Sequence, residues 1–451
     1  MRTRLAFMLV LLFVAGIVAS SAAQAKDLMA GVARVEIRPP SGVSMAGFGA
    51  RTGTSDGVLD YPQAKILVLE GKERAAALVT MDLAGIFPDG QTNAIRARVA
   101  KSCGIADVIF NCSHTHSGPT VEPESPLDWQ KTAVEEIGAA IERAWNSRVP
   151  ARFGLGQGSV FIGHNRLYLM ADGNGKMLWR NETKMRTSPV DPTAMLLRVD
   201  RQDGTPLVIV VNYACHPVVL GPSNLKYSAD YPGEMMRTVE SSLPGGPMCM
   251  FLQGAAGDIN PYYDKTPISE NAVGLMQETG RKLGAEVLRV AKTIVTKPAP
   301  DSDIRISREI LQFRGRWNKE KFMARFSNQT VSEAMRRRVE RMFRGSYDAP
   351  VTLLLVNRDF AFVGVPAEIF VDYQIEIRER VPDFPILFGG YTNGNLAYVP
   401  TIKGAVDGGY GASETGSILE VGAGDKMIDK AVIQLGYWTG KLKSAPEAAK
   451  E

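Results

Sequence analysis

Two hydrophobic periodicities divide the chain into expected strands and helices. Apolar or alternating runs predict strands at 30–37, 65–69, 75–81, 106–110, 196–200, 206–212 and within 350–366. An apolar spacing of three to four residues predicts helices at 91–102, 128–145, 269–292 and 319–344. Strands and helices therefore mix along most of the chain, which predicts an α/β fold of mixed β-sheets with peripheral helices. No internal repeat is visible.

The first 25 residues have the pattern of a secretory signal peptide. Arg2 and Arg4 precede an apolar stretch from 5 to 18, and residues 23–25 read Ala-Gln-Ala, as at a cleavage site. An uncleaved membrane anchor is the alternative, although the apolar stretch is short for a membrane span. We therefore expect an exported protein, either periplasmic or secreted.

The rest of the chain has an ordinary globular composition, with 45% hydrophobic residues. Removal of Arg2 and Arg4 lowers the formal charge from +4 to +2. This balance gives no reason to expect a nucleic-acid partner. A small-molecule or lipid substrate, with at most transient contact with a membrane surface, fits it better. We expect one domain from 26 to 440 and a frayed tail from 441 to 451, and the oligomeric state stays open.

Three of the four histidines lie just beyond expected buried strands. His114 and His116 follow the strand at 106–110, and His216 follows the strand that begins at 206. Residues at strand ends are held at the rim of a sheet, where many enzymes place their chemistry. On an extended segment His114 and His116 would share one face, roughly 6.5–7 Å apart. Both can then bind one metal ion, or one can bind metal while the other contacts substrate.

Other candidate groups also follow expected strands. Glu368 comes after an apolar run that begins at Val363, and a carboxylate often joins histidines in zinc hydrolases. Tyr398 and Tyr410 offer phenols that can bind zinc or donate to an oxyanion. The stretch from 251 to 261 is a strand that runs into a glycine-rich loop, whose backbone N–H groups can approach a substrate closely.

The four cysteines, Cys103, Cys112, Cys215 and Cys249, have no spacing typical of a disulfide framework. We therefore expect buried free thiols that pack as small apolar groups. Disulfide formation and zinc binding by Cys112 or Cys215 are the alternatives.

Together these motifs resemble the neutral (non-lysosomal) ceramidases, zinc amidases that cleave N-acylsphingosines. The similarity covers most of the chain and keeps the family's order of motifs. The shared motifs are His-Thr-His-Ser-Gly-Pro at 114–119, His-Pro at 216–217, Gly-Asp-x-x-Pro at 257–261, Pro-x-Glu at 366–368 and Tyr-Val-x-Thr at 398–401. The resemblance implies a ceramidase-like catalytic domain.

The resemblance also implies roles for single residues. The zinc ligands that it implies are His114, His216, Glu368 and Tyr398. It makes His116 and Tyr410 substrate-facing groups that stabilise a developing oxyanion. Arg166 matches the family's pocket arginine, and Gly47 matches a glycine near the active site.

The chain departs from the family in its glycine-rich loop and in the residues after His-Ser-Gly-Pro. The family has a serine, its proposed nucleophile or water-positioning group, where this chain has Asn260. An amide cannot form an acyl-enzyme, but it can hold an oxyanion. Asp258 in the same loop and Glu122 are candidate substrate-binding residues, and Glu124 is a second carboxylate beside Glu122. The family's C-terminal immunoglobulin-like domain has no counterpart in these 451 residues, and together these departures favour a substrate other than ceramide.

The sequence thus predicts an exported zinc-dependent hydrolase that uses metal-activated water on an amide bond of the ceramidase type. His116, Tyr410 and Asn260 would stabilise the oxyanion, and the leaving-group acid is unassigned. One alternative is a zinc hydrolase of a polar ester or lactone. The other is a catalytically inactive periplasmic binding protein that keeps the zinc site as a structural element, and Asn260 favours it.

Overall fold

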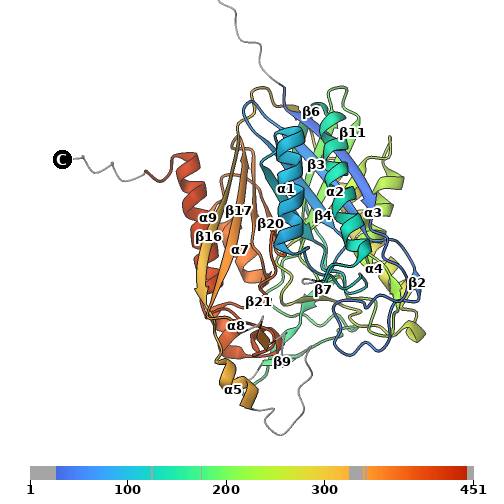
Figure 1. Ribbon diagram of the computed structural model, residues 1–451, viewed down its shortest axis with the longest axis vertical. Helices are drawn as coiled ribbons and strands as arrows, with labels where there is room; N and C mark the ends of the chain where they lie inside the picture. Colours follow the sequence, from blue (N-terminus) through green and yellow to red (C-terminus); the bar gives the residue numbers. More distant parts are fainter. Residues whose placement is uncertain (1–26, 123–124, 174, 325–338, 341–342, 444–451) are drawn as a thin grey trace, which may run out of the picture.

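A computed structural model describes residues 27–122, 125–173, 175–324, 339–340 and 343–443. The expected signal peptide, Glu124, most of the helix expected at 319–344 and the tail beyond 443 lie outside the described residues. Figure 1 shows the chain coloured along the sequence.

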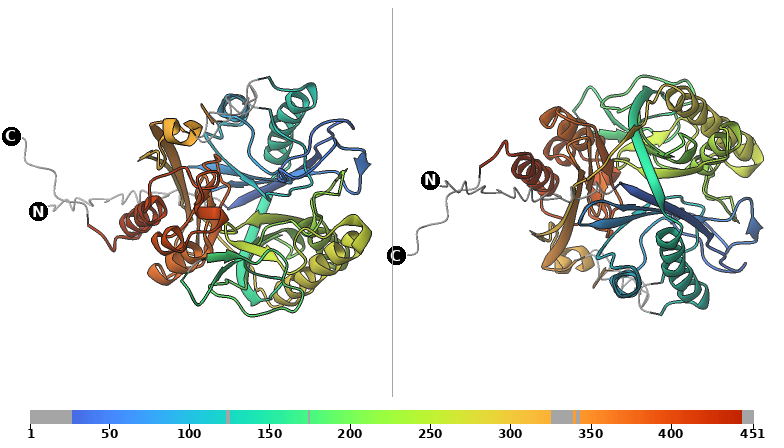
Figure 2. Two further views of the ribbon diagram at one scale, coloured as in Figure 1. Left: turned by 90° about the horizontal axis from the view of Figure 1, so that it is seen from below. Right: turned by 90° about the horizontal axis from the view of Figure 1, so that it is seen from above.

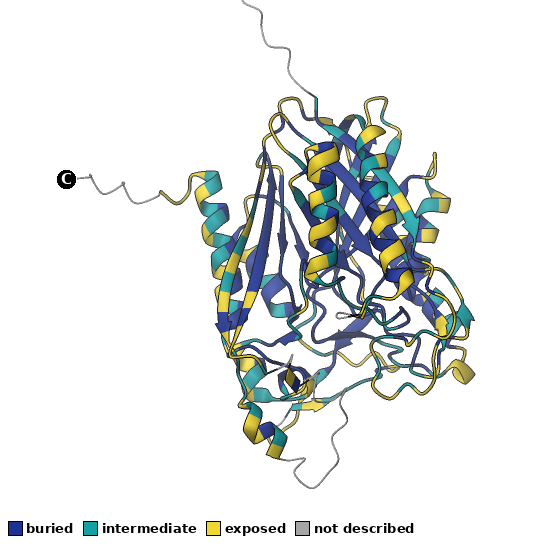
Figure 3. Cartoon of the chain, in the orientation of Figure 1, coloured by how far each residue is buried: buried dark blue, intermediate teal, exposed yellow. Residues whose placement is uncertain are grey.

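The described residues form two packed sheets whose outer faces are covered by helices (Figures 1 and 2). A nine-stranded sheet and a four-stranded sheet share one apolar layer, in which Leu67 and Leu197 of the first meet Leu354 and Phe362 of the second. Figure 3 shows buried sheets beneath helices with exposed outer faces. This arrangement confirms the expected α/β fold with mixed sheets and peripheral helices.

The nine-stranded sheet consists of two halves in which the same elements follow one another. The first half contains β1 (Met29–Glu36), β3 (Gln63–Glu70), β4 (Ala75–Met81), α1 (Asp89–Cys103), β5 (Asp107–Cys112) and α2 (Asp128–Asn146). The second half contains β6 (Val149–Ser159), β10 (Thr193–Arg201), β11 (Pro206–Tyr213), α3 (Tyr231–Ser242), β13 (Met248–Gln253) and α4 (Ala272–Ala291). Each half has two antiparallel ladders followed by a parallel pair across a helix. The repetition is visible in the structure, although the sequence shows none.

The two halves are joined narrowly and then diverge. β1 and β6 pair only through Met29 with Pro150 and Ala30 with Val149. The outer strands β5 and β13 come back together at their ends, where the Gln253 N–H donates to Asn111 Oδ1 at 3.0 Å. The sheet is therefore folded into a V, which is visible from below in Figure 2.

The four-stranded sheet closes this V. Its strands, in spatial order, are β16 (Ile304–Arg314), β17 (Ser346–Val356), β18 (Phe360–Gly364) and β20 (Ile386–Gly389). Alternate residues of its strands face opposite ways: Leu354 faces the nine-stranded sheet, whereas Leu353 joins the cluster that contains α7 and α9. These helices are α7 (Val371–Arg380) and α9 (Ala423–Thr439).

Short elements complete the described part of the chain. They are β2 (Gly57–Val58), β7 (Gly163–Asn165), β8 (Leu167–Leu169), β9 (Gly175–Met177), β12 (Lys226–Tyr227), β14 (Ile259–Pro261), η1 (Ile268–Glu270), β15 (Lys297–Pro298), α5 (Lys319–Ala324), β19 (Glu368–Ile369), β21 (Tyr398–Val399), α8 (Ile402–Asp407) and η2 (Tyr410–Ala412). Two of them, β19 and β21, begin with residues of the site described below, Glu368 and Tyr398. No helix among the described residues is long and apolar enough to cross a membrane.

The predicted elements agree closely with the observed ones, with two differences at helix ends. The helix expected from 269 begins at Ala272, because a separate 3-10 turn precedes it. The helix expected to end at 344 is confirmed at 319–324, but residues 343 and 344 are not helical. All four cysteines are buried and free, as expected.

Buried asparagines tie together the ends of strands that belong to different sheets. Asn111, in β5, donates from Nδ2 to the Gly390 carbonyl at 2.6 Å, just after β20. Asn212, in β11, donates to the Phe388 carbonyl at 2.7 Å and accepts from the Phe388 N–H at 2.9 Å. Both side chains are 0% exposed. The loops that follow β5, β11 and β20 therefore begin close to one another.

Asn111→Leu should destabilise the protein by about 2–4 kcal/mol, because it leaves the Gln253 N–H and the Gly390 carbonyl buried without this partner. Urea unfolding followed by circular dichroism measures the change. Asn146→Leu, at the exposed end of α2, is the control and should change stability by less than about 0.5 kcal/mol. Equal stability of the two variants would show that the asparagine contacts contribute little.

Candidate metal centre

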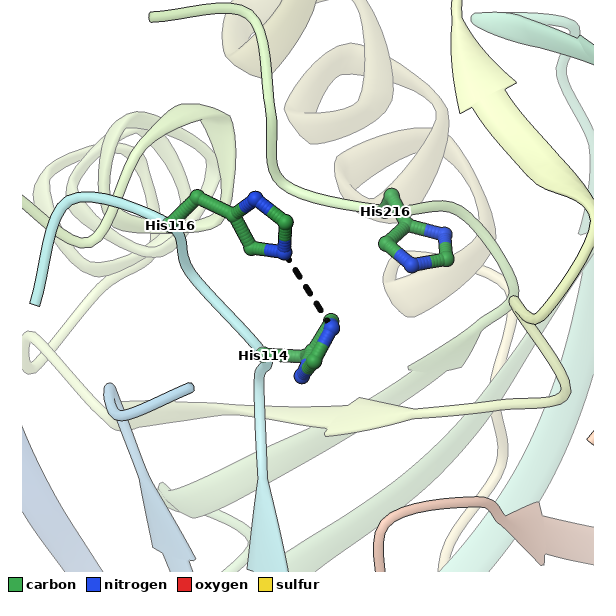
Figure 4. A group of neighbouring side chains, drawn as sticks. All are labelled: His114, His116 and His216. Atoms are coloured by element: carbon green, nitrogen blue, oxygen red, sulfur yellow. Dashed lines mark hydrogen bonds between the residues drawn. The ribbon is translucent and has the colours of Figure 1, made fainter. Parts of the chain in front are cut away.

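Loops from both halves of the large sheet bring three histidines together. The ligand atoms of His114, His116 and His216 all lie within 4.8 Å of one another (Figure 4). Glu368, which follows β18 of the other sheet, joins them with Oε2 at 3.2 Å from His114 Nε2 and 3.4 Å from His216 Nε2. This buried group could hold a metal ion.

The backbone between the first two histidines is not extended, contrary to the expectation from the sequence. His114 has a φ of 66°, in the left-handed region that residues other than glycine rarely adopt. Hydrogen bonds from the Ser113 N–H to the Met81 carbonyl and from the His114 N–H to the Leu83 carbonyl hold this turn. The two imidazoles still meet, with 3.2 Å between their Nε2 atoms. Such strain at a site is common where function requires it.

Backbone carbonyls fix which ring nitrogen of His114 and His216 faces the centre. Nδ1 of His114 lies 2.5 Å from the Ala84 carbonyl, and Nδ1 of His216 lies 3.1 Å from the Ile259 carbonyl. A carbonyl only accepts, so Nδ1 must carry the hydrogen in both rings. Nε2 is therefore the nitrogen of each ring that is left to bind a metal ion, as in metal-binding histidines.

The charges of the group also suit a cation. Burial opposes ionisation of Glu368, but the facing imidazoles of His114 and His216 outweigh it and hold the pKa of Glu368 well below its usual range. Burial lowers the pKa of His216 to about 4, so this ring is neutral at pH 7. Glu368 Oε2 thus lies 3.2 Å from Nε2 of His114 and 3.4 Å from Nε2 of His216. Such an arrangement fits a divalent metal ion.

His116 differs from the other two histidines. Burial, together with the neighbouring imidazoles, lowers the pKa of His116 well below 6.5, and its buried Nδ1 has no hydrogen-bond partner among the described residues. Its Nε2 lies 3.2 Å from His114 Nε2, within hydrogen-bonding distance. Arg51 donates to the His116 carbonyl at 2.7 Å and so holds the backbone rather than the ring.

Gly47 lies against the His116 ring, at a position that only a glycine can occupy without strain. It has a φ of +97°, and a Cβ there would lie 2.2 Å from Cγ of His116. The glycine therefore lets the segment 46–51 close over the His116 ring, with Phe48 in edge contact at 4.6 Å.

A cavity of about 820 Å³ lies over the histidines and glutamate. The expected site residues that line it are Gly47, His114, His116, Arg166, Asn260, Glu368, Tyr398 and Tyr410. His216 is 0% exposed and lies beneath this lining. Motifs more than 350 residues apart in the sequence thus meet in one cavity.

Arg166 organises one wall of this cavity. Its guanidinium donates to Asn260 Oδ1 at 3.1 Å and to the Gly257 carbonyl at 2.7 Å, and its carbon lies 5.2 Å from the centre of the Tyr398 ring. Asn260 in turn donates from Nδ2 to Asp264 Oδ2 at 2.7 Å. An amide has two N–H hydrogens on Nδ2, so one remains for another acceptor.

Two expected substrate-binding residues are not brought into the cavity. Asp258 is 2% exposed, and its carboxylate accepts from Asn165 Nδ2 at 2.6 Å and from the Val371 N–H at 2.9 Å. These contacts tie the glycine-rich loop to the start of α7, which is a positioning role. Glu122 is exposed and lies outside the cavity lining, although the neighbouring Thr120 and Val121 belong to it.

Sequence reasoning missed a tyrosine beside the histidines. The ring of Tyr391 stacks on His114 with centroids 4.4 Å apart, and its hydroxyl lies 3.5 Å from His216 Nε2. The sequence pattern that could have identified it is Gly-Gly-Tyr at the end of an apolar strand, β20. His164, the fourth histidine, lies apart, stacked on Tyr262 and bonded to the Leu178 carbonyl.

Comparisons with known proteins support the fold. No protein-family model matches the chain, and no curated protein matches it. The solved structure of neutral ceramidase from Pseudomonas aeruginosa is similar, with a TM-score of 0.73, 19% identity, and coverage of 94% of this chain and 76% of that one. A ceramidase complexed with C2 has a TM-score of 0.73 at 17% identity, with coverage of 94% and 77%. The ceramidase-like fold implied by the motifs is thus confirmed.

His216→Ala should bind only a small fraction of the zinc that the wild-type protein takes up, because it removes one of the convergent ring nitrogens. Elemental analysis of the purified protein after dialysis measures the metal content. His164→Ala is the matched control and should keep its metal. Circular dichroism checks that both variants are folded, and full zinc content in folded His216→Ala would contradict this role.

Proposed function

We propose that the protein is an exported zinc-dependent hydrolase that cleaves an amide bond of the N-acyl type. The observation that carries the proposal is the convergence of Nε2 of His114, Nε2 of His216 and Oε2 of Glu368 beneath a large cavity. The ceramidase-like fold supports amide hydrolysis. The proposal of export rests on the signal-peptide pattern of residues 1–25.

The proposed zinc ligands are His114, His216, Glu368 and Tyr398. The first three face one another directly. Tyr398 lines the same cavity and stacks beside His216 at 6.4 Å. Burial raises the pKa of Tyr398 well above its usual range, although the charge of Arg166 opposes this, so a bound metal ion would have to stabilise its phenolate form. A zinc ion bound there supplies Lewis-acid chemistry, since it lowers the pKa of a water and polarises a carbonyl.

The remaining cavity residues would stabilise the negative charge that develops on the carbonyl oxygen. Tyr410 lines the cavity with its ring 5.5 Å from that of Tyr398, so its hydroxyl is a candidate donor. Neutral His116 is a second donor through its ring N–H, and the free N–H of Asn260 is a third. Preorganised donors of this kind are often the largest single contribution to catalysis.

Water is the nucleophile that this site favours. The position where the ceramidases have a serine holds Asn260, whose amide is engaged by Arg166 and Asp264. An amide cannot form an acyl-enzyme, so no covalent intermediate is expected at this position.

A pair of histidine variants tests the assignment. His116→Gln should keep about one zinc per chain but lose roughly 10²–10³-fold in kcat, the usual effect of removing an oxyanion donor. His114→Gln should lose both metal and activity. Zinc analysis is combined with a hydrolysis assay on N-acyl amides, among them a short-chain N-acylsphingosine. Loss of zinc from His116→Gln would instead make His116 a ligand, and an inactive zinc-loaded wild-type protein would favour the binding-protein alternative.

Gly47→Ala should lower kcat at least tenfold with zinc retained, because the new methyl group collides with the His116 ring and moves it. Gly49→Ala is the matched control two residues away, where a Cβ meets nothing within 4 Å. The same assay measures both variants, and equal activity would show that the ring position is not critical.

A further inference from the structure

One lysine in the cavity wall has no part in the proposed hydrolysis. Lys265 and Asp264 follow β14 and both line the cavity. The Lys265 ammonium lies 3.7 Å from Asp264 Oδ2 and 3.2 Å from the centre of the Trp179 ring. The lysine side chain is 31% exposed, so it is largely withdrawn from solvent yet open to the cavity.

Lys265 reaches the cavity wall from a strained backbone conformation. Its φ is 54°, in the left-handed region that is unfavourable for a residue with a Cβ. Hydrogen bonds from the Lys265 N–H to the Val218 carbonyl at 2.8 Å and from the Thr266 N–H to the Val219 carbonyl at 2.9 Å hold this conformation. Val218 comes two residues after His216, so the lysine is built onto the same loop as the metal centre.

The ammonium of Lys265 keeps donors for another partner. A distance of 3.7 Å is too long for a hydrogen bond, and Asp264 Oδ2 already accepts from Asn260. An ammonium has three donors. The guanidinium of Arg166 is different, because it already donates to Asn260 Oδ1 and to the Gly257 carbonyl.

A second positive charge close to Lys265 favours the binding of an anion. The Arg166 guanidinium lies 5.3 Å from the centre of the same Trp179 ring that Lys265 contacts. Asp264 supplies one carboxylate beside these two cations, so the three groups together carry a net positive charge. An anion bound to Lys265 would balance this charge in a cavity where charges are only partly screened.

We propose that Lys265 binds a carboxylate of the substrate. The inference rests on the proposed hydrolase and narrows its substrate to N-acyl amides that carry a carboxylate in their amine or acyl part. A charge-assisted hydrogen bond of this kind is stronger than a neutral one and fixes orientation. Ceramide has no anionic group, so this subsite separates the protein's substrate from ceramide.

Matched substrates test the proposal. N-octanoylglycine carries a carboxylate on the amine side, with N-octanoylethanolamine as its neutral counterpart. N-octylsuccinamic acid carries one on the acyl side, with N-octylbutanamide as its counterpart. Lys265→Met should raise the KM of one carboxylate substrate about 10–100-fold relative to its counterpart. Lys265→Arg should keep most of the preference, and Lys292→Met, at the exposed end of α4, should keep all of it.

An equal change in KM for charged and neutral substrates in Lys265→Met, or no change, would overturn the carboxylate subsite while leaving the hydrolase standing. If the zinc-loaded wild-type protein hydrolyses none of the four compounds, the proposed function fails for these amides. Isothermal titration calorimetry with N-octanoylglycine and N-octylsuccinamic acid then tests carboxylate binding at Lys265 independently of hydrolysis. Binding to the wild type that is weakened at least tenfold in Lys265→Met supports the subsite, whereas equal or absent binding rejects it.

Discussion

The site depends on the buried asparagine contacts that hold three strand ends together. Asn111 and Asn212 lie in the two halves of the large sheet, and both bond to the backbone at the end of β20 in the other sheet. A buried amide that loses such partners is costly, so the strand ends are fixed relative to one another. The histidine loops leave from these ends, and their convergence follows from that restraint.

Much of the site could be predicted because its residues follow strongly apolar runs. His114, His216 and Glu368 each come within four residues of the end of a buried strand, which is a local pattern that a sequence displays directly. Their meeting was implied by the resemblance to ceramidases and not by spacing. The extended backbone expected at His114 was wrong, because main-chain bonds to Met81 and Leu83 from another strand end decide that turn.

The rest could not be predicted because it depends on contacts between distant segments. Asp258 and Asp264 lie six residues apart in the same loop region. Their neighbours in the sequence do not indicate that Asp258 accepts a hydrogen bond from Asn165 whereas Asp264 lines the cavity. The position of Lys265 depends on pairing with Val218, and that of Tyr391 on the junction of two sheets. The repeated order of elements in the two half-sheets is likewise a property of topology, which sequence divergence conceals.

The orientation of His114 and His216 is set by peptide carbonyls, those of Ala84 and Ile259. Many metal sites use a carboxylate side chain for this purpose, which a single base change in the gene can remove. A main-chain carbonyl is present whatever amino acid occupies the position. The ring orientation here is therefore insensitive to most point substitutions at residues 84 and 259, whereas insertions or deletions in those loops would displace the carbonyls. Variation in metal affinity among natural variants should follow loop length more than loop composition.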